Sequence, residues 1–444
     1  MSIIEKAKQF AIEAHKGQVR KSEKEKPMII HPINTANILK EYGFDSNVVA
    51  AGYLHDVVED TKYTIEDIEK EFGEDIKSLV EGNTEPDKSL SWEERKKHTI
   101  EHVKNLDMRH KAVVCADKIS NLEDLMTLFE KNGEYNFSAF KRGYDDQKWY
   151  HENVYKSLIT NEDENNPMFI RYKELIDHIF NNKKDDPFIK DTIFEGKEDE
   201  YSNLLKLHYK KKELIKLKSI LDMRPYVIEF TGTPRTGKTT LMNNLNDFFK
   251  KGGFKVTTLE EFTTSDKYKK EIYPTLKDQY KSVINTKIPE YVLAQLEEAL
   301  SSNTDIIMID RSLLDRMIWA DRLYLKDGFT KEEYDAYIQK YIPIIKEKID
   351  CIVATYADSM TSLKRDYFAN LSLEKRNFLN IQNIEEYNTS LNNIEEISKK
   401  EGINLHVFDT SNKSQRDISI LATEAILSDM RDNYIKELNL KLNN

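Results

Sequence analysis

Two histidines and two aspartates in the first 120 residues have the types and spacing of a metal site. His55 and Asp56 are adjacent in GYLHDVVEDT, His31 lies in PMIIHPI, and Asp117 lies in VVCADKISNL. Two imidazoles and two carboxylates match an octahedral site for Mn²⁺ or a similar ion, with positions left for water and phosphate. Such an ion lowers the pKa of its water and polarises a phosphoryl oxygen, so the set predicts hydrolysis of a phosphate ester.

Two further carboxylates, Glu59 and Asp60, come four residues after His55 and Asp56. In a helix this spacing places each carboxylate on the face of the metal ligand one turn earlier. Either of them could orient or deprotonate the attacking water. Because an isolated histidine is more often a structural residue, the prediction depends on the whole set.

A phosphate-binding loop is predicted in YVIEFTGTPRTGKTT, which fits the pattern G-x-x-x-x-G-K-T. An apolar strand precedes it and a helical pattern follows, which is the context that such a loop requires. Backbone N–H groups hold the phosphates of ATP, Lys238 contacts the β- and γ-phosphates, and Thr239 ligates Mg²⁺. The predicted nucleotide-binding residues are Gly232, Thr233, Pro234, Arg235, Thr236, Gly237, Lys238, Thr239 and Thr240.

Candidate catalytic residues follow the next two apolar runs. Glu260 or Glu261, in TTLEEF, could be a catalytic base. Asp310 and Arg311, in IIMIDRSLLDR, are expected at the carboxyl end of a strand beside the loop. Asp310 could hold Mg²⁺ through water or contact the substrate, and Arg311 could hold a phosphate or a substrate hydroxyl.

A cation-rich stretch, SLKRDYFANLSLEKR, contains Lys364, Arg365 and Arg376. It suits a lid that closes over the transferred phosphate. The alternative is a solvated helix face.

The elements that position the first set are expected to be helices. Residues 1 to about 180 show consecutive amphipathic helical patterns, among them 46–60 and 111–127. Pro32 restricts His31, so His31 is expected to end an extended segment or loop before the next helix. The sequence therefore predicts a helical bundle.

The second set is expected on an α/β domain. Residues 181–200 are polar and charged and resemble a linker, and a helical stretch at 201–221 could be a spacer. Beyond it, apolar runs alternate with helical segments, which predicts a parallel sheet covered by helices. These runs are Tyr226–Phe230, Lys255–Leu259, Asp305–Ile309, Cys351–Thr355 and Asn404–Phe408. The expected domains are thus 1–180, a linker and spacer at 181–222, and a P-loop domain at 223–444.

Length and charge limit the other possibilities. A chain of 444 residues suggests two or three domains, and a net charge of −11 argues against a diffuse nucleic-acid-binding surface. No apolar run is long enough for a membrane helix. The sequence contains two cysteines, Cys115 and Cys351, which lie far apart, so we do not expect a disulfide framework. We expect a cytoplasmic protein whose partners are small nucleotides. Homo-oligomerisation is possible but does not follow from the sequence.

The first 155 residues or so resemble the HD-type hydrolase domain of the Rel/SpoT and small alarmone hydrolase family. The matching segments, in order, are AHKGQVRKS, IIHPI, AAGYLHDVVEDT, FGEDIKSLVEGNT and ADKISNL. The resemblance implies removal of the 3′-pyrophosphate of (p)ppGpp with Mn²⁺ at the four predicted ligands. It also implies that Glu59 and Asp60 serve the hydrolytic water.

The same resemblance extends to residues that contact the nucleotide. Arg20 and Asn121 match nucleotide-contacting positions, and Lys21 and Lys118 could also bind phosphate. Glu123 stands where the family usually has arginine.

Residues 225–444 resemble the thymidylate kinase and deoxynucleoside kinase group, through the P-loop, the DRS triad and the cation-rich stretch before EEYN. The resemblance implies ATP-dependent phosphorylation of a nucleoside or nucleotide, with the acceptor left open. Three hypotheses follow. The chain is a bifunctional hydrolase and kinase, or its P-loop domain is an ATP-binding switch for the hydrolase, or its first domain is a nucleotide sensor that turns over slowly.

Overall fold

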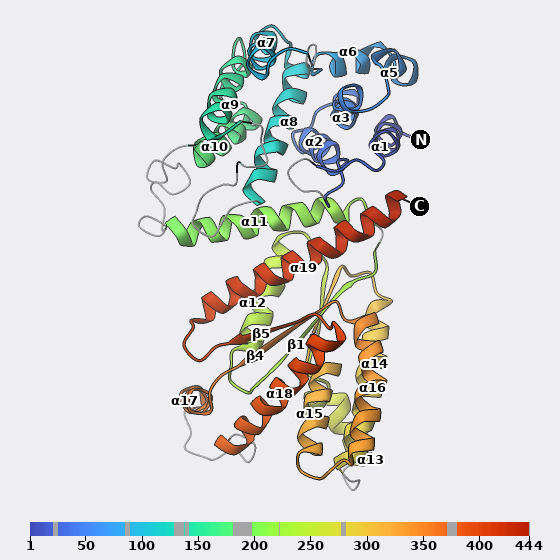
Figure 1. Cartoon of the computed structure of the whole chain (residues 1–444), viewed down its shortest axis with the longest axis vertical. Coiled ribbons are helices and arrows are strands. Elements are labelled where there is room, and N and C mark those ends of the chain that lie inside the picture. The colour runs from blue at the N-terminus through green and yellow to red at the C-terminus, as the bar shows by residue number, and fades with distance from the viewer. Residues whose placement is uncertain are drawn as a thin grey trace. The chain divides into compact units, whose positions relative to one another are not determined.

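The computed structural model describes residues 1–20, 25–84, 89–127, 137, 142–180, 198–221, 223–276, 281–370 and 380–443. The chain forms two compact units (Figure 1). Unit 1 contains Met1–Leu221 and Arg431–Asn444, and unit 2 contains Asp222–Met430.

Unit 1 is helical, as predicted. Its central helices are α2, α3 and α8, which bury Ile33, Leu54 and Ile119 in one apolar core. The helices of this unit are α1 (Ile3–Ala14), α2 (Ile30–Glu41), α3 (Ser46–Leu54), α4 (Val57–Asp60), α5 (Ile65–Phe72), α6 (Glu74–Glu81), α7 (Trp92–Lys104), α8 (Met108–Thr127), α9 (Tyr144–Leu158), α10 (Pro167–Phe180), α11 (Glu198–Lys218) and the end of α19 (Gln415–Asn443).

Helix α11 differs from the expected spacer, because it belongs to unit 1. Its side chains Leu207, Leu214 and Leu217 are buried. Two further residues of α11, Leu205 and Tyr209, pack against the core of unit 1. Residues 181–197 of the expected linker lie outside the described residues.

Glu123 joins three helices of unit 1. It lies on α8 with only 3% of its surface exposed, and its carboxylate pairs with Arg171 of α10. It also pairs with Lys216 of α11 at 2.8 Å and Lys212 at 3.9 Å. Burial raises the pKa of Glu123, but these cations outweigh burial and lower the pKa to about 2.

Replacing Glu123 by glutamine is expected to destabilise unit 1 by about 3 kcal/mol near neutral pH, the free-energy equivalent of the pKa difference between the unfolded and folded states. Because the folded pKa is the lower one, this stabilisation is present above a pH of about 4.5 and is lost as the pH falls toward about 2. Thermal unfolding of both proteins from pH 7 downward should show the difference shrink. Glu41→Gln is the matched control, because Glu41 contacts the same Arg171 but is 60% exposed. Equal losses in the two variants would contradict the prediction.

Unit 2 contains a parallel sheet in the order β2-β3-β1-β4-β5. Each of the five predicted apolar runs forms one of its strands, so the predicted α/β fold is confirmed. The strands are β1 (Tyr226–Gly232), β2 (Val256–Leu259), β3 (Ile306–Asp310), β4 (Cys351–Tyr356) and β5 (Leu405–Asp409).

Helices cover both faces of this sheet. In Figure 1, α14, α15, α16 and α18 lie on one side, and α12 lies on the other side with the first part of α19. The helices are α12 (Lys238–Lys251), η2 (Phe262–Thr264), η3 (Tyr268–Ile272), α13 (Tyr273–Leu276), α14 (Lys281–Leu300), α15 (Leu313–Tyr324), α16 (Lys331–Lys348), α17 (Ser359–Asn370), α18 (Ile381–Glu401) and α19 up to Met430. The strand order reverses at β1, so the loop after β1 opens at the point where such sheets bind ligands.

Candidate functional site

The His55–Asp56 pair lies at a break between two helices. The expected continuous helix 46–60 is interrupted there: His55 closes α3, and Asp56 begins α4 with φ −93° and ψ −6°. Both side chains therefore turn toward the same point, which adjacent residues of a regular helix do not do.

His31 reaches this point from α2. The expectation of an extended His31 was wrong, because α2 begins at Ile30 and contains His31 and Pro32 in its first turn. Proline is tolerated in the first helical turn, where its missing N–H has no intrahelical partner to lose. Asp117 comes from the middle of α8, as predicted.

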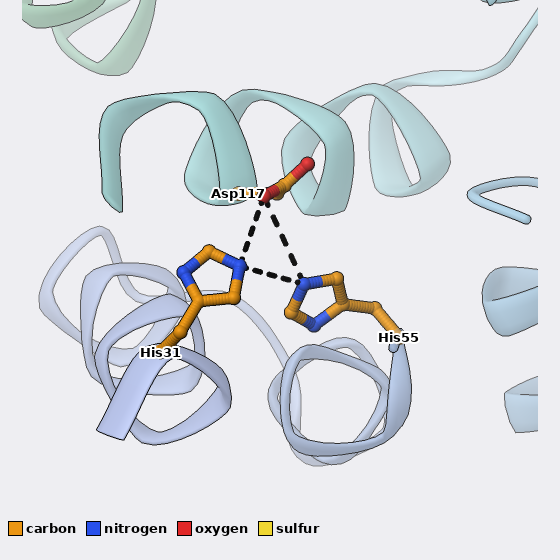
Figure 2. A group of neighbouring side chains, drawn as sticks. All are labelled: His31, His55 and Asp117. Carbon is orange, nitrogen blue, oxygen red and sulfur yellow. Dashed lines mark hydrogen bonds and ion pairs between the residues drawn. The ribbon is translucent and has the colours of Figure 1, made fainter. Parts of the chain in front are cut away.

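The four predicted ligands converge (Figure 2 shows His31, His55 and Asp117). The Nε2 atoms of the two histidines are 3.2 Å apart. An Asp117 oxygen lies 3.1 Å from His31 Nε2 and 3.8 Å from His55 Nε2. Asp56 oxygens lie 3.5 Å and 3.3 Å from the same two nitrogens.

The donor set fits a divalent cation. His55 Nδ1 donates to the carbonyl of Gly52 at 2.9 Å, which leaves the lone pair of the neutral ring on Nε2. His31 Nδ1 contacts Ser120 Oγ at 2.9 Å, so its ring is also held from behind. Two buried imidazoles whose Nε2 atoms face each other between two carboxylates have the arrangement of metal ligands.

The charge of the two carboxylates is maintained despite burial. Burial raises the pKa of Asp117, but Lys118, at 2.5 Å, and His31 hold that pKa well below its usual range. Burial also raises the pKa of Asp56, and His55 and His31 lower it further than burial raises it. Both groups are therefore ionised near neutral pH, as metal ligands must be.

These ligands line a cavity of about 750 Å³ that also contains the other predicted residues of unit 1. Glu59, Asp60, Lys118, Asn121 and Arg20 all line it. Lys21 lies outside the described residues.

Arg20 and Asn121 lie side by side on the cavity wall. Arg20 donates to Asn121 Oδ1 at 3.0 Å and to Asp124 at 2.9 Å, and Asn121 donates to Asp117 at 2.7 Å. Asn121 therefore connects the predicted metal ligands to the predicted nucleotide contacts. Glu123 is not among the cavity-lining residues, since its carboxylate pairs with α10 and α11.

The sequence interpretation missed one wall of the cavity, helix α7. Arg95, Lys96, His98 and His102 of this helix line the cavity, as does Tyr150 of α9. Residues 95, 98 and 102 are separated by three and four positions, so they share one helix face. A basic face at helical spacing was the signal that could have revealed this wall.

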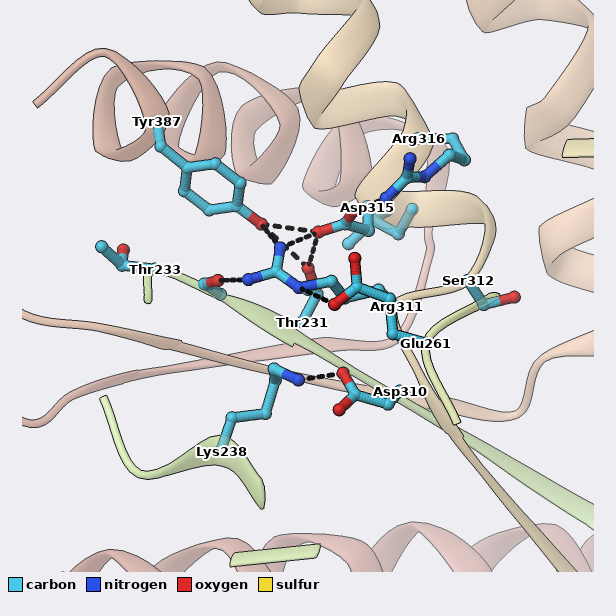
Figure 3. A network of polar contacts seen from close by, with 12 residues as sticks. Thr231, Thr233, Lys238, Glu261, Asp310, Arg311, Ser312, Asp315, Arg316 and Tyr387 are labelled. Carbon is cyan, nitrogen blue, oxygen red and sulfur yellow. Dashed lines mark hydrogen bonds and ion pairs between the residues drawn. The ribbon is translucent and has the colours of Figure 1, made fainter. Parts of the chain in front are cut away.

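The P-loop of unit 2 has the backbone geometry that phosphate binding requires. Gly232 has φ +136°, and a Cβ there would lie 1.9 Å from the carbonyl oxygen of Thr355. Gly237 has φ +87° and precedes α12, whose first residue is Lys238. Lys238 contacts Asp310 at the end of β3, so both predicted residues face the loop (Figure 3).

Arg311 is held in a buried network next to this loop (Figure 3). It has φ 59°, a left-handed conformation that is rare for residues other than glycine. Its guanidinium donates to Asp315 at 2.7 Å and to the carbonyl of Gly232 at 2.9 Å, and it pairs with Glu261 at 3.3 Å. Of the two predicted bases, Glu261 therefore joins the network, whereas Glu260 is exposed.

Several members of the network were not predicted, among them Asp315, Thr231 and Tyr387. Asp315 also accepts hydrogen bonds from Thr231 and Tyr387, each at 2.7 Å. The signal for Asp315 was its place four residues after Arg311, one helical turn on. Tyr387 comes from α18, and nothing in the local sequence links it to this network.

Glu229 anchors the segment that follows Arg311. Its carboxylate accepts backbone N–H bonds from Ser312, Leu314 and Asp315 at 2.9–3.1 Å, at the start of α15. Burial raises its pKa to about 7 against the effect of these donors. Glu229 thus holds the start of α15, the segment that directly follows Arg311.

Part of the predicted lid is described. Helix α17 contains Lys364, which is exposed, and Arg365, which donates to Thr410 Oγ1 at 2.9 Å. Asp366 of the same helix accepts from Arg235 of the P-loop at 2.6 Å, so α17 touches the loop. Arg376 lies outside the described residues.

Comparisons with known proteins match both units. An HD domain model matches residues 7–136, and a model described as an AAA domain matches residues 227–399. The guanosine-3′,5′-bis(diphosphate) 3′-pyrophosphohydrolase MESH1 of Xenopus tropicalis is 44% identical over 126 residues, which are 28% of this chain and 70% of that relative.

Two solved structures are also similar. One, described as a metazoan ortholog of SpoT that hydrolyses ppGpp, is 32% identical, covers 39% of this chain and 94% of its own, and has a TM-score of 0.34. The other, deoxyadenosine kinase from M. mycoides with bound dATP, is 22% identical, covers 45% of this chain and 98% of its own, and has a TM-score of 0.31.

The fold and the site of unit 1 define a divalent-metal-dependent phosphohydrolase domain of the HD type, followed in this chain by a P-loop unit. Through unit 1, the chain belongs to the MESH1 family of HD-domain hydrolases. Among the described residues, no helix is both long and apolar enough to span a membrane.

Proposed function

We propose that unit 1 removes the 3′-pyrophosphate of (p)ppGpp or a closely similar guanine nucleotide, with Mn²⁺ as the metal. The observation that carries the proposal is that four predicted metal ligands converge in one cavity. The same cavity is lined by cationic side chains, Arg20 and Lys118 on one part and Arg95 and Lys96 of α7 on another. The relative from Xenopus tropicalis bears the name of this activity and is 44% identical to this chain over 126 residues.

The residues of this chain have distinct roles in the proposed reaction. A bound divalent ion supplies Lewis-acid chemistry, acidifying water and polarising the phosphoryl oxygen. Glu59 or Asp60 accepts the proton of the water that attacks the 3′-phosphorus, the bond between that phosphorus and the 3′-oxygen breaks, and the 3′-oxygen takes a proton from solvent as it leaves. Lys118 and Arg20 offset the negative charge of the pyrophosphate group under attack.

The substrate test compares ppGpp with GDP, GTP and NADPH in the presence of Mn²⁺, measuring pyrophosphate and phosphate separately. Release of pyrophosphate from ppGpp alone supports the proposal. Cleavage of another nucleotide in preference to ppGpp would contradict the proposed substrate but would still support a hydrolase activity of unit 1. No turnover of any candidate would favour the sensor hypothesis.

A substitution of Lys96 tests whether α7 binds the phosphate groups of the substrate. Its Nζ lies 4.6 Å from the centre of the Tyr150 ring, and both residues line the cavity. Lys96→Ala is expected to raise KM by about tenfold with little change in kcat, because one charge-assisted contact to the bound substrate is lost. Lys97→Ala is the control, since Lys97 is exposed and does not line the cavity. Equal KM values in the two variants would contradict this assignment.

For unit 2, we propose an ATP-dependent kinase acting on a nucleoside or nucleotide, with Mg²⁺. Glu261 is held beside Arg311, near Lys238 and Asp310, which suits a base next to the transferred phosphate (Figure 3). Incubation with ATP labelled at the γ-phosphate and a panel of nucleosides and nucleotides tests the proposal. A labelled nucleotide product supports it, and label found only in free phosphate opposes it.

Helix α19 favours a second candidate, in which ATP at the P-loop regulates the hydrolase. Gln415, the first residue of α19, donates to a P-loop carbonyl at 3.3 Å. Further along the helix, Arg431 belongs to unit 1 and pairs with Glu213 at 2.8 Å, and Glu213 pairs with Lys26 at 2.6 Å. Lys26 pairs in turn with Asp124 of the cavity wall. A change in hydrolysis on adding ATP, lost in Arg431→Ala, would support this candidate.

A further inference from the structure

A second group of metal-ligand side chains lies in unit 2. Cys351 is the first residue of β4, His406 lies in β5, and Asp429 lies on α19. One ligand atom of each residue lies within 4.8 Å of those of the other two. We propose that these three residues bind a zinc-type divalent ion, at a site separate from that of unit 1.

The strand register explains why these residues meet. Val353 of β4 is the partner of His406 in β5. Cys351 precedes Val353 by two residues, so the side chains of Cys351 and His406 point to the same face of the sheet. Asp429 reaches that face from α19, and its carboxylate accepts from His406 Nε2 at 2.6 Å.

The donor atoms suit zinc. Thiolate, imidazole and carboxylate are the groups that zinc prefers, and tetrahedral zinc places its ligand atoms about 3.3–3.8 Å apart. Small side-chain movements are therefore enough to admit the ion. Asn404 donates to Asp429 at 2.8 Å and to the carbonyl of Asp350 at 3.0 Å, so the carboxylate is oriented by a residue outside the ligand set.

Binding of the metal ion releases one proton to solvent. Without metal, His406 Nε2 donates to Asp429, and the Cys351 sulfur lies within 4.8 Å of the same carboxylate. On binding, the thiol loses its proton to solvent, and the His406 proton moves to Nδ1 so that Nε2 can ligate. The side chains of His406 and Asp429 are 29% and 21% exposed, so the ion can enter from solvent and keep a water molecule as its fourth ligand.

The three proposed zinc ligands lie far from the P-loop. Thr355, which contacts Thr236 of the P-loop at 2.7 Å, lies four residues beyond Cys351 along β4. Four residues of strand span about 13 Å, so the group lies toward the opposite end of the sheet from the phosphates. A metal there would fasten α19 to β4 and β5.

Cobalt substitution tests the site on the full chain. A thiolate bound to Co²⁺ gives a sulfur-to-metal charge-transfer absorption, which the ligands of unit 1 cannot give because they contain no sulfur. We expect this absorption to appear on titrating the reduced protein with Co²⁺ and to disappear when Zn²⁺ is added. Its absence at saturating Co²⁺ would overturn the proposal.

Variants identify the ligands. Cys351→Ser and His406→Gln are expected to lose the absorption, and zinc should raise the Tm of the wild type by more than that of His406→Gln, in which the site of unit 1 can still bind it. Cys115→Ser is the matched control, because Cys115 is the other buried cysteine and lies in unit 1. Persistence of the absorption in Cys351→Ser, or its loss in Cys115→Ser, would overturn the assignment. Because His406 is partly exposed, His406→Gln keeps the test informative if Cys351→Ser fails to fold.

Discussion

Replacing Asp56 by asparagine is expected to reduce metal-dependent hydrolysis by about 1,000-fold or more, because a loss of about 4 kcal/mol of transition-state stabilisation has that effect. Asp56 provides oxygens at 3.5 Å and 3.3 Å from the Nε2 atoms of His31 and His55. Asparagine keeps the shape of the side chain but removes the charge that offsets the cation. The bound metal and the rate should therefore fall together.

The measurements are metal content after dialysis against Mn²⁺ and the initial rate of pyrophosphate release. Glu71→Gln is the control, since Glu71 is an exposed carboxylate that pairs with Lys6 on the surface. Unchanged circular dichroism of Asp56→Asn would show that the fold is kept. An Asp56→Asn protein that hydrolyses within tenfold of wild type would remove Asp56 from the ligand set.

The local sequence was sufficient to predict an element where one pattern, such as a short apolar run, determined its structure. Short apolar runs between helical patterns located all five strands; the central strands β3, β1 and β4 are buried on both faces, whereas the edge strands β2 and β5 are partly exposed. The four residues predicted as ligands of unit 1 stood out because their residue types are rare in an apolar setting. Their convergence depends on the break at His55 and Asp56, which the helical pattern of the surrounding residues did not indicate.

Other features depended on contacts between distant segments. The restriction on a residue before proline predicted an extended His31, but the packing of α2 against α3 and α8 decided in favour of a helix. Glu123 could be assigned only once Arg171 and Lys216 were known to reach it. Tyr387 joins Arg311 across 76 positions of sequence for the same reason.

Replacing Lys238 by alanine is expected to reduce any transfer of the ATP γ-phosphate by at least about 100-fold, because removing one preorganised electrostatic group costs that much. Lys238 begins α12, is 9% exposed and contacts Asp310, so its ammonium lies where the phosphates enter the loop. Lys251→Ala, an exposed lysine at the other end of α12, is the control and should transfer at the wild-type rate.

The same variant separates the two candidate functions of unit 2. If unit 2 is a kinase, Lys238→Ala abolishes the labelled product and leaves hydrolysis by unit 1 unchanged, with or without ATP. If unit 2 is a switch, the wild type makes no labelled product, and Lys238→Ala instead removes the effect of ATP on hydrolysis. Because Lys238 and the ligands of unit 1 belong to different compact units, a loss of hydrolysis without ATP would indicate damage to the fold, which the Tm would reveal. Labelled product that persists in Lys238→Ala at the wild-type rate would exclude the P-loop as its source.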